Sequence, residues 1–376
     1  MNTIKAELNK IIFALTSVGL LILLIFPASL SANHFRYGTM SWDLVDNDTI
    51  TLKMENGWTA NHSSFRFTSV GTIKNNFIKI YWGDGSNTYV VLKILSRDTA
   101  GDMNDTISEM GDYASSTWTT GVTHDYDNGT YLVYWDSYAR ASVANKEDGY
   151  SSNGTGGNSN RWRNETMVRI GGDYIGNVSP VSAVPPVVQV QDNKTFTYQV
   201  SATDANSDNL TYRWGTKAEF FNGSGSFVMP TGMTLSYDGL IEWNILDNNS
   251  AIDTGVNDFW SAFIMVEDNG SSGDNKSYIP IDFFFKTACA TCAPPPFTDF
   301  PTGTQTVSIG NTKVFTIKSK DDSTAAPTIS VMSPCSDNSS IWSTTTSNSM
   351  VGEDNTTTFT INFTPDSSMG GTTCVV

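Results

Sequence analysis

The stretch VSPVSAVPPVVQVQDNKTFTYQVSATDANSDNLTYRW, residues 178–214, decides the fold class of this chain. Three prolines stiffen its start, and a first strand is expected through Val188 and Val190. After a turn, apolar and polar side chains alternate: Phe196, Tyr198, Val200 and Ala202 are separated by Thr197, Gln199 and Ser201. Alternation with a period of two turns one face of a strand toward a core and the other toward water. The stretch therefore predicts the entry into a β-sandwich.

The composition extends this prediction to the rest of the chain. With 376 residues the chain is longer than a single core usually grows, so two or three domains are expected. Thr, Ser, Asn, Gly, Val and aromatic residues are abundant, and no long pattern with helical period follows the N-terminus, which favours strands. The formal net charge of -16 excludes a nucleic-acid partner, because little in the chain would neutralise a phosphate backbone.

The N-terminus is typical of a secretory signal peptide over residues 1–32. Lys5 and Lys10 precede an apolar run from residue 11 to residue 26, and small residues follow up to Ala32. An uncleaved anchor helix is the alternative, although the run is short for a membrane span. Numerous Asn-x-Ser/Thr sequons suit a glycoprotein, or arise by chance in a chain rich in these residues. We expect an extracellular or cell-surface protein that reaches the membrane only through this segment or through an anchor beyond Val376.

Residues 33–176 are expected to form a first sandwich. Strand candidates separated by turn residues are Thr49 to Met54, Ser64 to Phe67, Phe77 to Trp82, Tyr89 to Leu95, Gly129 to Trp135 and Thr166 to Ile170. The segments IYWGDGSNTY (80–89) and THDYDNGTYLVYW (123–135) resemble the turn and the later strand of the polycystic-kidney-disease (PKD) fold. Here Trp82 directly precedes the Gly-Asp-Gly turn, which departs from the PKD spacing.

A wider resemblance is carried by HFRYGTMSW (34–42), WGDGS (82–86) and NVSPVSAVPPVV (177–188), in that order. These motifs resemble a group of secreted multidomain proteins of bacteria and animals, in which a PKD-like first domain leads through a proline hinge into cadherin-like or immunoglobulin-like repeats. The resemblance covers most of residues 33–286 and implies location and fold rather than an enzymatic activity. Related sequences often carry a cysteine pair late in the first domain. This chain has no cysteine before Cys289, so no disulfide is expected there.

The remaining chain is expected to hold two more units. Residues 177–287 predict a cadherin-like or immunoglobulin-like sandwich, with strands at Leu210 to Trp214, within Met229 to Trp243, and at Phe259 to Asp268 and Tyr278 to Lys286. Residues 288–376 predict the hinge CATCAPPPF and an incomplete third immunoglobulin-like domain, in which Thr312 to Ile317 corresponds to Lys194 to Tyr198. The predicted fold class is all-β, with tandem sandwiches after the signal peptide.

One group of residues suggests ligand chemistry. Asp204, Asn206 and Asp208 alternate after a strand. In cadherin-like folds such loops meet an acidic residue of another strand, here Asp268 or Glu267, and the resemblance implies a calcium site with hard oxygen ligands. A polar turn, in which Asn and Asp side chains bond to their own backbone, is the alternative. Asp321 and Asp322 are the corresponding turn of the third unit.

No catalytic constellation is apparent. His34, His62 and His124 are the only histidines and lie far apart, which argues against a zinc enzyme, and His124 is expected to be packed or hydrogen-bonded. Neither a nucleophile elbow nor a P-loop is present. Cys289 and Cys292 have the spacing of a redox motif but lie in a proline-rich hinge, where a structural role is expected. Cys335 and Cys374 are candidates for a disulfide within the third unit.

Three classes of function follow. The leading one is a non-enzymatic surface protein for adhesion or structural presentation, with extracellular protein or glycan ligands as partners. The second is a carbohydrate-binding protein that would stack sugars on exposed aromatic residues; the candidates are Trp58, Trp118, Trp162 and Trp260. The third is the accessory part of a secreted hydrolase whose catalytic domain follows Val376.

Overall fold

The computed structural model describes residues 35–60, 64–65, 68–98, 105–137, 162–182, 184, 187–190, 195–221, 232–245, 259–270, 273–287, 297–299, 306–321, 342–351 and 354–367. The expected signal peptide, all four cysteines, His34, His62 and Asp322 lie outside these residues.

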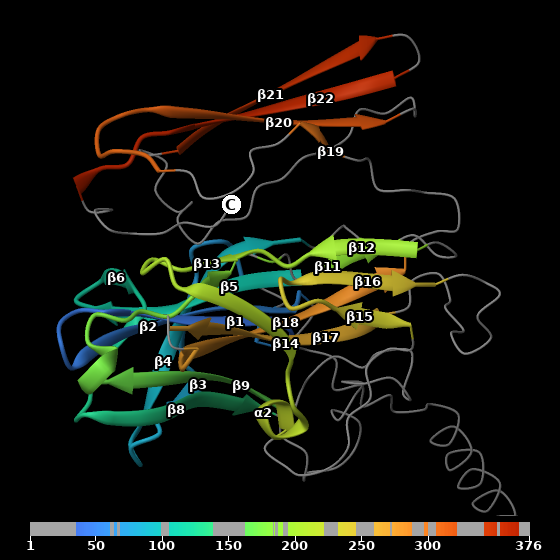
Figure 1. Cartoon of the computed structure of the whole chain (residues 1–376). Coiled ribbons are helices and arrows are strands. Elements are labelled where there is room, and N and C mark those ends of the chain that lie inside the picture. Colours follow the sequence, from blue (N-terminus) through green and yellow to red (C-terminus); the bar gives the residue numbers. More distant parts are fainter. Residues whose placement is uncertain are drawn as a thin grey trace, which may run out of the picture.

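The described chain is an all-β protein, which confirms the predicted fold class (Figure 1). The strands are β1 (Phe35–Leu44), β2 (Thr49–Thr59), β3 (Ile73–Tyr81), β4 (Asn87–Arg97), β5 (Asp105–Ala114), β6 (Thr117–Thr120), β7 (Val122–Asp125), β8 (Gly129–Ser137), β9 (Trp162–Ile170), β10 (Val181–Ser182), β11 (Val187–Val190), β12 (Thr195–Gln199), β13 (Ala202–Thr203), β14 (Asn209–Trp214), β15 (Met233–Leu235), β16 (Leu240–Asn244), β17 (Phe259–Asn269), β18 (Asn275–Thr287), β19 (Phe297–Asp299), β20 (Lys313–Asp321), β21 (Trp342–Val351) and β22 (Asp354–Phe363). The helical elements are η1 (Gly172–Tyr174) and α2 (Lys217–Phe221).

Most of the expected strands are present, but one expected strand is a turn and one strand of the sheet was not expected. Ser64 and Phe65 form a turn rather than a strand, and the carbonyl of Phe65 accepts a hydrogen bond from the amide of Thr68 at 2.9 Å. The strand that was not expected is β5, since no sequence pattern predicted it. It lies between β2 and β4 in the middle of the largest sheet.

The largest sheet runs in the order β1-β2-β5-β4-β3-β8-β9-β18-β17-β14 and returns to its start, because β18 also pairs with β1. On one edge of β18, Tyr278 pairs with Met167 of β9, Ile281 pairs with Thr39 of β1, and the last residues pair in parallel with β11. The strands from β1 to β9 therefore enclose a common interior, which β18 closes.

That interior is an aromatic core. Phe35 stacks on Trp162 with ring centroids 3.8 Å apart and makes edge contacts with Trp58 and Trp135. Trp42, Trp82 and the apolar side chains of β2, β3 and β4 continue the cluster. Burial of this much apolar surface is the main force that holds the strands together.

Strands β17 and β18 are buried on both of their faces. Phe263 and Met265 of β17 belong to the first core, whereas Ala262, Ile264 and Val266 belong to a second core. The second core lies against a smaller sheet of the order β12-β16-β15, whose Trp243 meets Trp260 at 5.0 Å. A strand covered on both sides needs a nearly continuous apolar sequence, which explains FWSAFIMV and YIPIDFFF.

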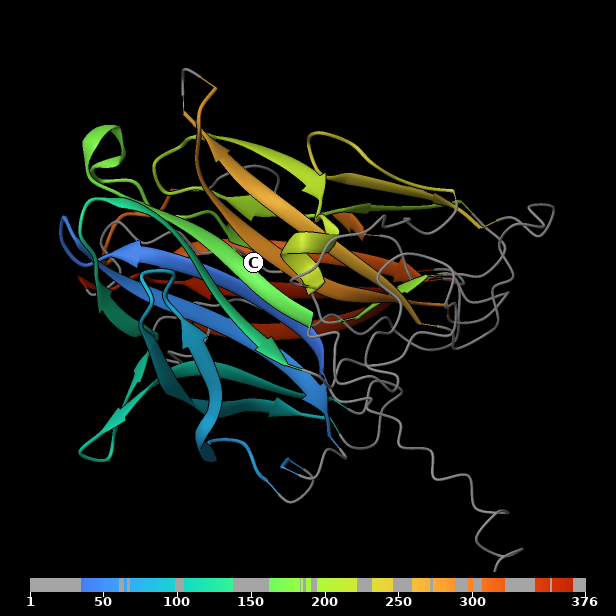
Figure 2. The same cartoon turned by 90° about the horizontal axis from the view of Figure 1, so that it is seen from below.

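This arrangement bears on the expected boundary at residues 176 and 177. The separate domains 33–176 and 177–287 remain a prediction, but the backbone hydrogen bonds between β18 and β1 cross that boundary. Figure 2 shows the blue strands β1 and β2 and the orange strands β17 and β18 in one body. A four-stranded sheet, β19-β20-β22-β21, is drawn as a separate layer in Figure 1 and contains the strand expected near Thr312 to Ile317, and β10 pairs with β13 in a sheet of two strands.

Candidate metal centre

Three of the four predicted ligands lie together at one end of the second sandwich. Asp204 and Asp208 come from the loop between β13 and β14, and Asp268 comes from the end of β17, which pairs with β14. One carboxylate oxygen from each of these residues lies within 4.8 Å of the other two. Oxygens around a calcium ion at 2.3 to 2.6 Å have this spacing, about 3 to 5 Å, so the three carboxylates fit such an ion.

The deepest of these carboxylates is Asp268, whose side chain is 0% exposed. Its Oδ2 accepts hydrogen bonds from Nδ2 of Asn177 at 3.0 Å and from the hydroxyl of Ser277 at 3.2 Å. Among the described residues its Oδ1 has no hydrogen-bond partner, and neither do Oδ2 of Asp204 and Oδ1 of Asn177. Buried oxygens without a partner are costly, and a cation that accepts several oxygen ligands would remove that cost.

The carboxylates also perturb one another. Burial raises the pKa of Asp268, the hydrogen bond from Asn177 opposes this, and the charges of Asp204 and Asp208 add to it, giving a pKa of about 6. Burial likewise raises the pKa of Asp204, and the charge of Asp208 contributes in the same direction. Like charges held this close together favour protonation or a bound cation.

Asn206, the fourth predicted ligand, has a different role in the structure. Its Oδ1 accepts a hydrogen bond from the amide of Val178 at 2.9 Å, and its Nδ2 donates to the carbonyl of Gly176 at 2.9 Å. The Asn206 side chain thus fastens its loop to the start of the expected hinge at residues 177–188. The polar-turn alternative is also realised in part, because Oδ1 of Asp204 accepts from the amide of Asp208 at 3.0 Å. One loop therefore forms a local turn and presents carboxylates to a common point.

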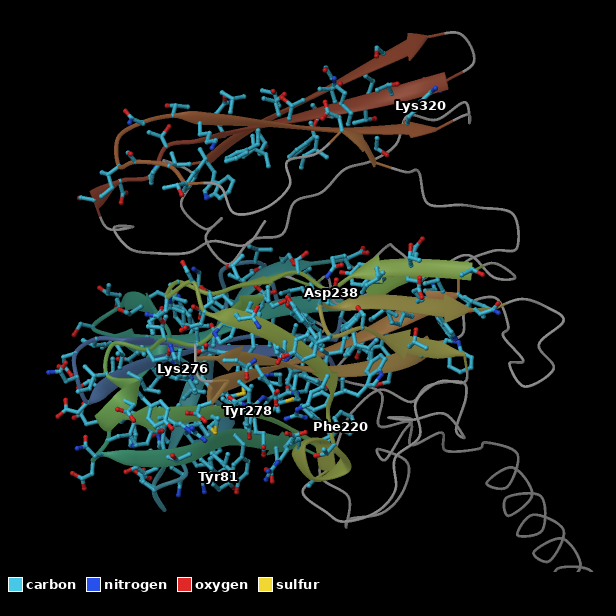
Figure 3. The ribbon with its side chains drawn as sticks, viewed as in Figure 1. Tyr81, Phe220, Asp238, Lys276, Tyr278 and Lys320 are labelled. Atoms are coloured by element: carbon cyan, nitrogen blue, oxygen red, sulfur yellow. The ribbon has the colours of Figure 1, made fainter. Side chains whose placement is uncertain are left out.

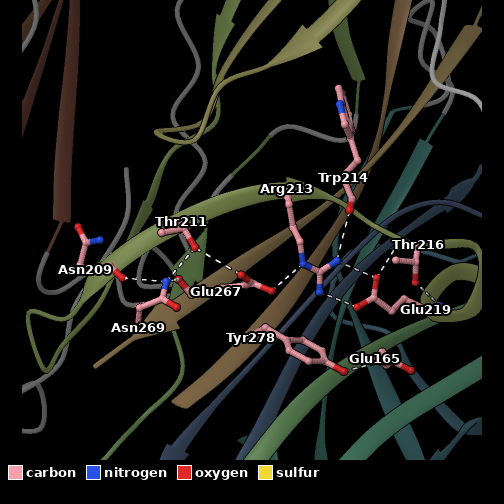
Figure 4. Close-up of polar contacts among 10 residues, drawn as sticks. All are labelled: Glu165, Asn209, Thr211, Arg213, Trp214, Thr216, Glu219, Glu267, Asn269 and Tyr278. Carbon is pink, nitrogen blue, oxygen red and sulfur yellow. Dashed lines mark hydrogen bonds and ion pairs between the residues drawn. The ribbon is translucent and has the colours of Figure 1, made fainter. Parts of the chain in front are cut away.

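The structure decides between Asp268 and Glu267. Successive side chains of a strand point to opposite faces, so these two cannot share a site. Figure 4 shows Glu267 bound to Arg213, with its Oε1 2.6 Å from Nε, while the guanidinium also makes two bonds with Glu219. Glu267 is engaged in this ion-pair network and does not belong to the acidic cluster.

Two residues at the cluster were not anticipated. Asn177 reaches Asp268 from the hinge and is 4% exposed. Lys276 of β18, labelled in Figure 3, donates from its ammonium to Oδ2 of Asp208 at 2.5 Å. The only signal in the sequence is the position of Asn177 directly before VSPVS and that of Lys276 two residues before the strand expected from Tyr278. Neither position reveals the direction of the side chain.

The other candidate residues are mostly structural. Trp58, Trp162 and Trp260 are at most 2% exposed, so three of the four candidate sugar platforms lie in the cores. Trp118 is half-buried, and the ammonium of Lys93 lies 5.5 Å from its ring centre. His124 is packed and bonded as expected: it stacks on Trp82 at 4.3 Å, and its Nε2 lies 2.8 Å from Oδ2 of Asp84.

Comparison with known proteins finds distant relatives that are named integrin beta-like proteins. No family model matches the chain. Integrin beta-like protein A of Dictyostelium discoideum is 24% identical over 278 residues, which are 68% of this chain and 12% of that protein. Integrin beta-like protein C of the same organism is 25% identical over 303 residues, 76% of this chain and 13% of that protein. Integrin beta-like protein B is 26% identical over 225 residues, which are 57% of this chain and 10% of that protein. The chain thus spans about an eighth of the length of the first two relatives.

Among the described residues, no helix has the length and apolar character that a membrane span requires.

Proposed function

We propose that this chain is a non-catalytic extracellular segment that serves adhesion or structural presentation at a cell surface, and that a calcium ion stiffens its hinge. The names of the integrin beta-like relatives support the adhesion class. The fold supports it as well, since tandem β-sheets with their side chains engaged in packing suit a scaffold that holds a binding face away from a membrane. Its partners would be extracellular proteins or glycans.

The observation that carries the calcium proposal is the set of buried oxygens around Asp268. Asp204 and Asp208 would supply charge from the loop, Asp268 from β17, and Oδ1 of Asn177 a neutral ligand from the hinge. An ion held by these groups would connect the hinge to three strands of the second sandwich. Carboxylate and amide oxygens are the ligands that calcium prefers.

Calcium titration of the secreted full chain tests the metal site. Calcium at 100 times its Kd would stabilise the fold by about 2.7 kcal/mol, so millimolar calcium should raise the melting temperature by several degrees. Asp268→Asn should lose this response, whereas Asp173→Asn, an exposed acid in η1, should keep it. If calcium left the melting temperature of the wild-type protein unchanged, the proposed calcium site would be contradicted.

Bead assays test the adhesion class. Beads coated with the secreted chain should bind one another or cells of the source organism, and chelation of calcium should weaken this binding. Beads coated with Asp268→Asn protein should bind less at the same surface density. Coated beads that bind no more than albumin-coated beads under any calcium concentration would contradict an adhesive role.

A further inference from the structure

Lys276 contacts the same acidic cluster that is assigned to calcium above. Its ammonium donates to Oδ2 of Asp208 at 2.5 Å, and one carboxylate oxygen each of Asp204, Asp208 and Asp268 lie within 4.8 Å of one another. Lys276 pairs with none of the oxygens that lack a partner on Asp204, Asp268 and Asn177. The lysine therefore neutralises part of the cluster and leaves its deepest oxygens unused.

We propose that Lys276 is a tethered counter-ion that competes with a divalent cation for Asp208. The ammonium holds Asp208 in the ion-free protein, and calcium binding drives it off that oxygen. This inference rests on the calcium site proposed above and concerns its regulation: the lysine lowers the affinity for calcium and stabilises the ion-free fold.

The argument from charge is direct. Three carboxylates and one ammonium leave the cluster negative, and a doubly charged ion in contact with all three carboxylates would compensate it better. An ammonium beside such an ion would be repelled, because both positive charges share one low-exposure site.

The geometry gives the lysine a way to leave. Its side chain is 24% exposed, whereas Asp268 is fully buried. A Cβ added to Gly270 would lie 3.0 Å from Cε of Lys276, so the aliphatic arm passes over a residue that offers no side chain to trap it. A flexible arm at the rim of the cluster can move toward water without a change in the strands.

Calcium affinity of the full chain tests the competition. Lys276→Met removes the charge and keeps an unbranched arm, and isothermal titration should show calcium binding at least tenfold tighter than in wild type. In EDTA the same variant should melt at a lower temperature, because the carboxylates lose their counter-ion. Lys320→Met, on β20 of the separate sheet, removes the same charge elsewhere and should leave the Kd within twofold of wild type.

The outcomes separate the two proposals. Wild-type binding with an unchanged or weaker Kd in Lys276→Met overturns the competition and keeps the calcium site. Binding by Lys276→Met alone supports the competition and removes calcium from the native protein. Absence of binding in both proteins, with folded melting curves, overturns both proposals.

Wild-type protein offers a second measurement that needs no variant to fold. Reductive methylation followed by peptide mass spectrometry reports the accessibility of each lysine. Calcium should increase the methylation rate of Lys276 severalfold and leave that of Lys320 unchanged. Equal or slower methylation of Lys276 at saturating calcium would overturn the displacement.

Discussion

Asp84 holds the tight turn after β3. Gly83 adopts a φ of 84°, and a Cβ there would come within 2.7 Å of the backbone of Leu132, so only glycine fits before the aspartate. Oδ1 of Asp84 accepts from the amide of Ser86 at 2.7 Å and from its hydroxyl at 2.6 Å, while Oδ2 contacts His124. Burial raises the pKa of Asp84, but the hydrogen bonds from Ser86 and His124 outweigh it and lower the pKa to about 2.

Acid titration should reveal this carboxylate. Because its pKa in the folded chain lies below the ordinary value of 3.8, its stabilisation is present above pH 4 and is lost as the pH falls toward 2. Asp84→Asn should therefore cost about 1 to 2 kcal/mol at pH 7 and flatten the decline in melting temperature between pH 4 and pH 2. Asp127→Asn, an exposed acid nearby, is the control. If the melting temperature fell equally steeply between pH 4 and pH 2 in wild type and in Asp84→Asn, the lowered pKa of Asp84 would be contradicted.

The cluster around Asp268 shows what single residues disclose in the sequence. Alternation along the strand predicts that Glu267 and Asp268 face opposite sides, but the pairing of β17 with β14 is needed to know which side meets the loop. Asn206 was predicted as a ligand from its place in the alternating loop and from the cadherin-like resemblance, and its hydrogen bond to Val178 depends on a segment 28 residues away. Asn177 and Lys276 were missed for the same reason, since tertiary contacts orient them.

At the level of elements, Arg213 joins β14, β17 and α2. It bonds Glu267 across the strand pair and Glu219 of the short helix through two nitrogens, and Glu219 also accepts from the amide of Thr216 at 2.6 Å. These charge-assisted bonds hold α2, whose Phe220 is fully buried in the first core.

Arg213→Met should destabilise the fold by about 2 kcal/mol, because both glutamates would remain partly buried without their cation. Arg213→Lys should recover less than half of this loss, since an ammonium cannot bond Glu219 through two nitrogens and still reach Glu267. Urea denaturation measures both effects, and the loss on Arg213→Met should shrink in a Glu219→Gln/Glu267→Gln background. If Arg213→Met cost the same free energy of unfolding in both backgrounds, Arg213 and the two glutamates would not be energetically coupled.

The strands differ in how well their own sequences predict them. The strand at 195–199 was predicted from its alternation of apolar and polar residues, and in the structure Thr197 and Gln199 are exposed while Phe196 and Tyr198 are half-buried. Strand β5, DTISEMGDYA, has few residues that favour strands, and its buried Ser108 and Glu109 are satisfied by Asn56 and Lys93 on neighbouring strands. Its place in the sheet follows from partners that are distant in the sequence.

At the level of the whole molecule, one strand pair serves two cores. Phe263 and Met265 on one face of β17 complete the first core, and Ile279, Ile281 and Phe283 of β18 line the second. Sequence patterns predict two separate sandwiches, and that division stays a prediction, because a nearly continuous apolar strand does not reveal what covers each face.

Expression of residues 33–176 alone tests this shared construction. The fragment lacks β18, which closes the sheet onto β1, and also Phe220, Phe263, Met265 and Tyr278 of the first core. Each large apolar side chain contributes about 1.5 to 3 kcal/mol on burial, so their joint loss is comparable with the 5 to 15 kcal/mol that holds a typical domain together. We expect the fragment to show no cooperative thermal transition and poor dispersion of amide resonances, whereas residues 33–287 should melt cooperatively and show dispersed spectra. A sharp two-state transition of the 33–176 fragment would instead show that the first core is complete without the strands that follow the hinge, and that β18 only docks onto a finished sheet.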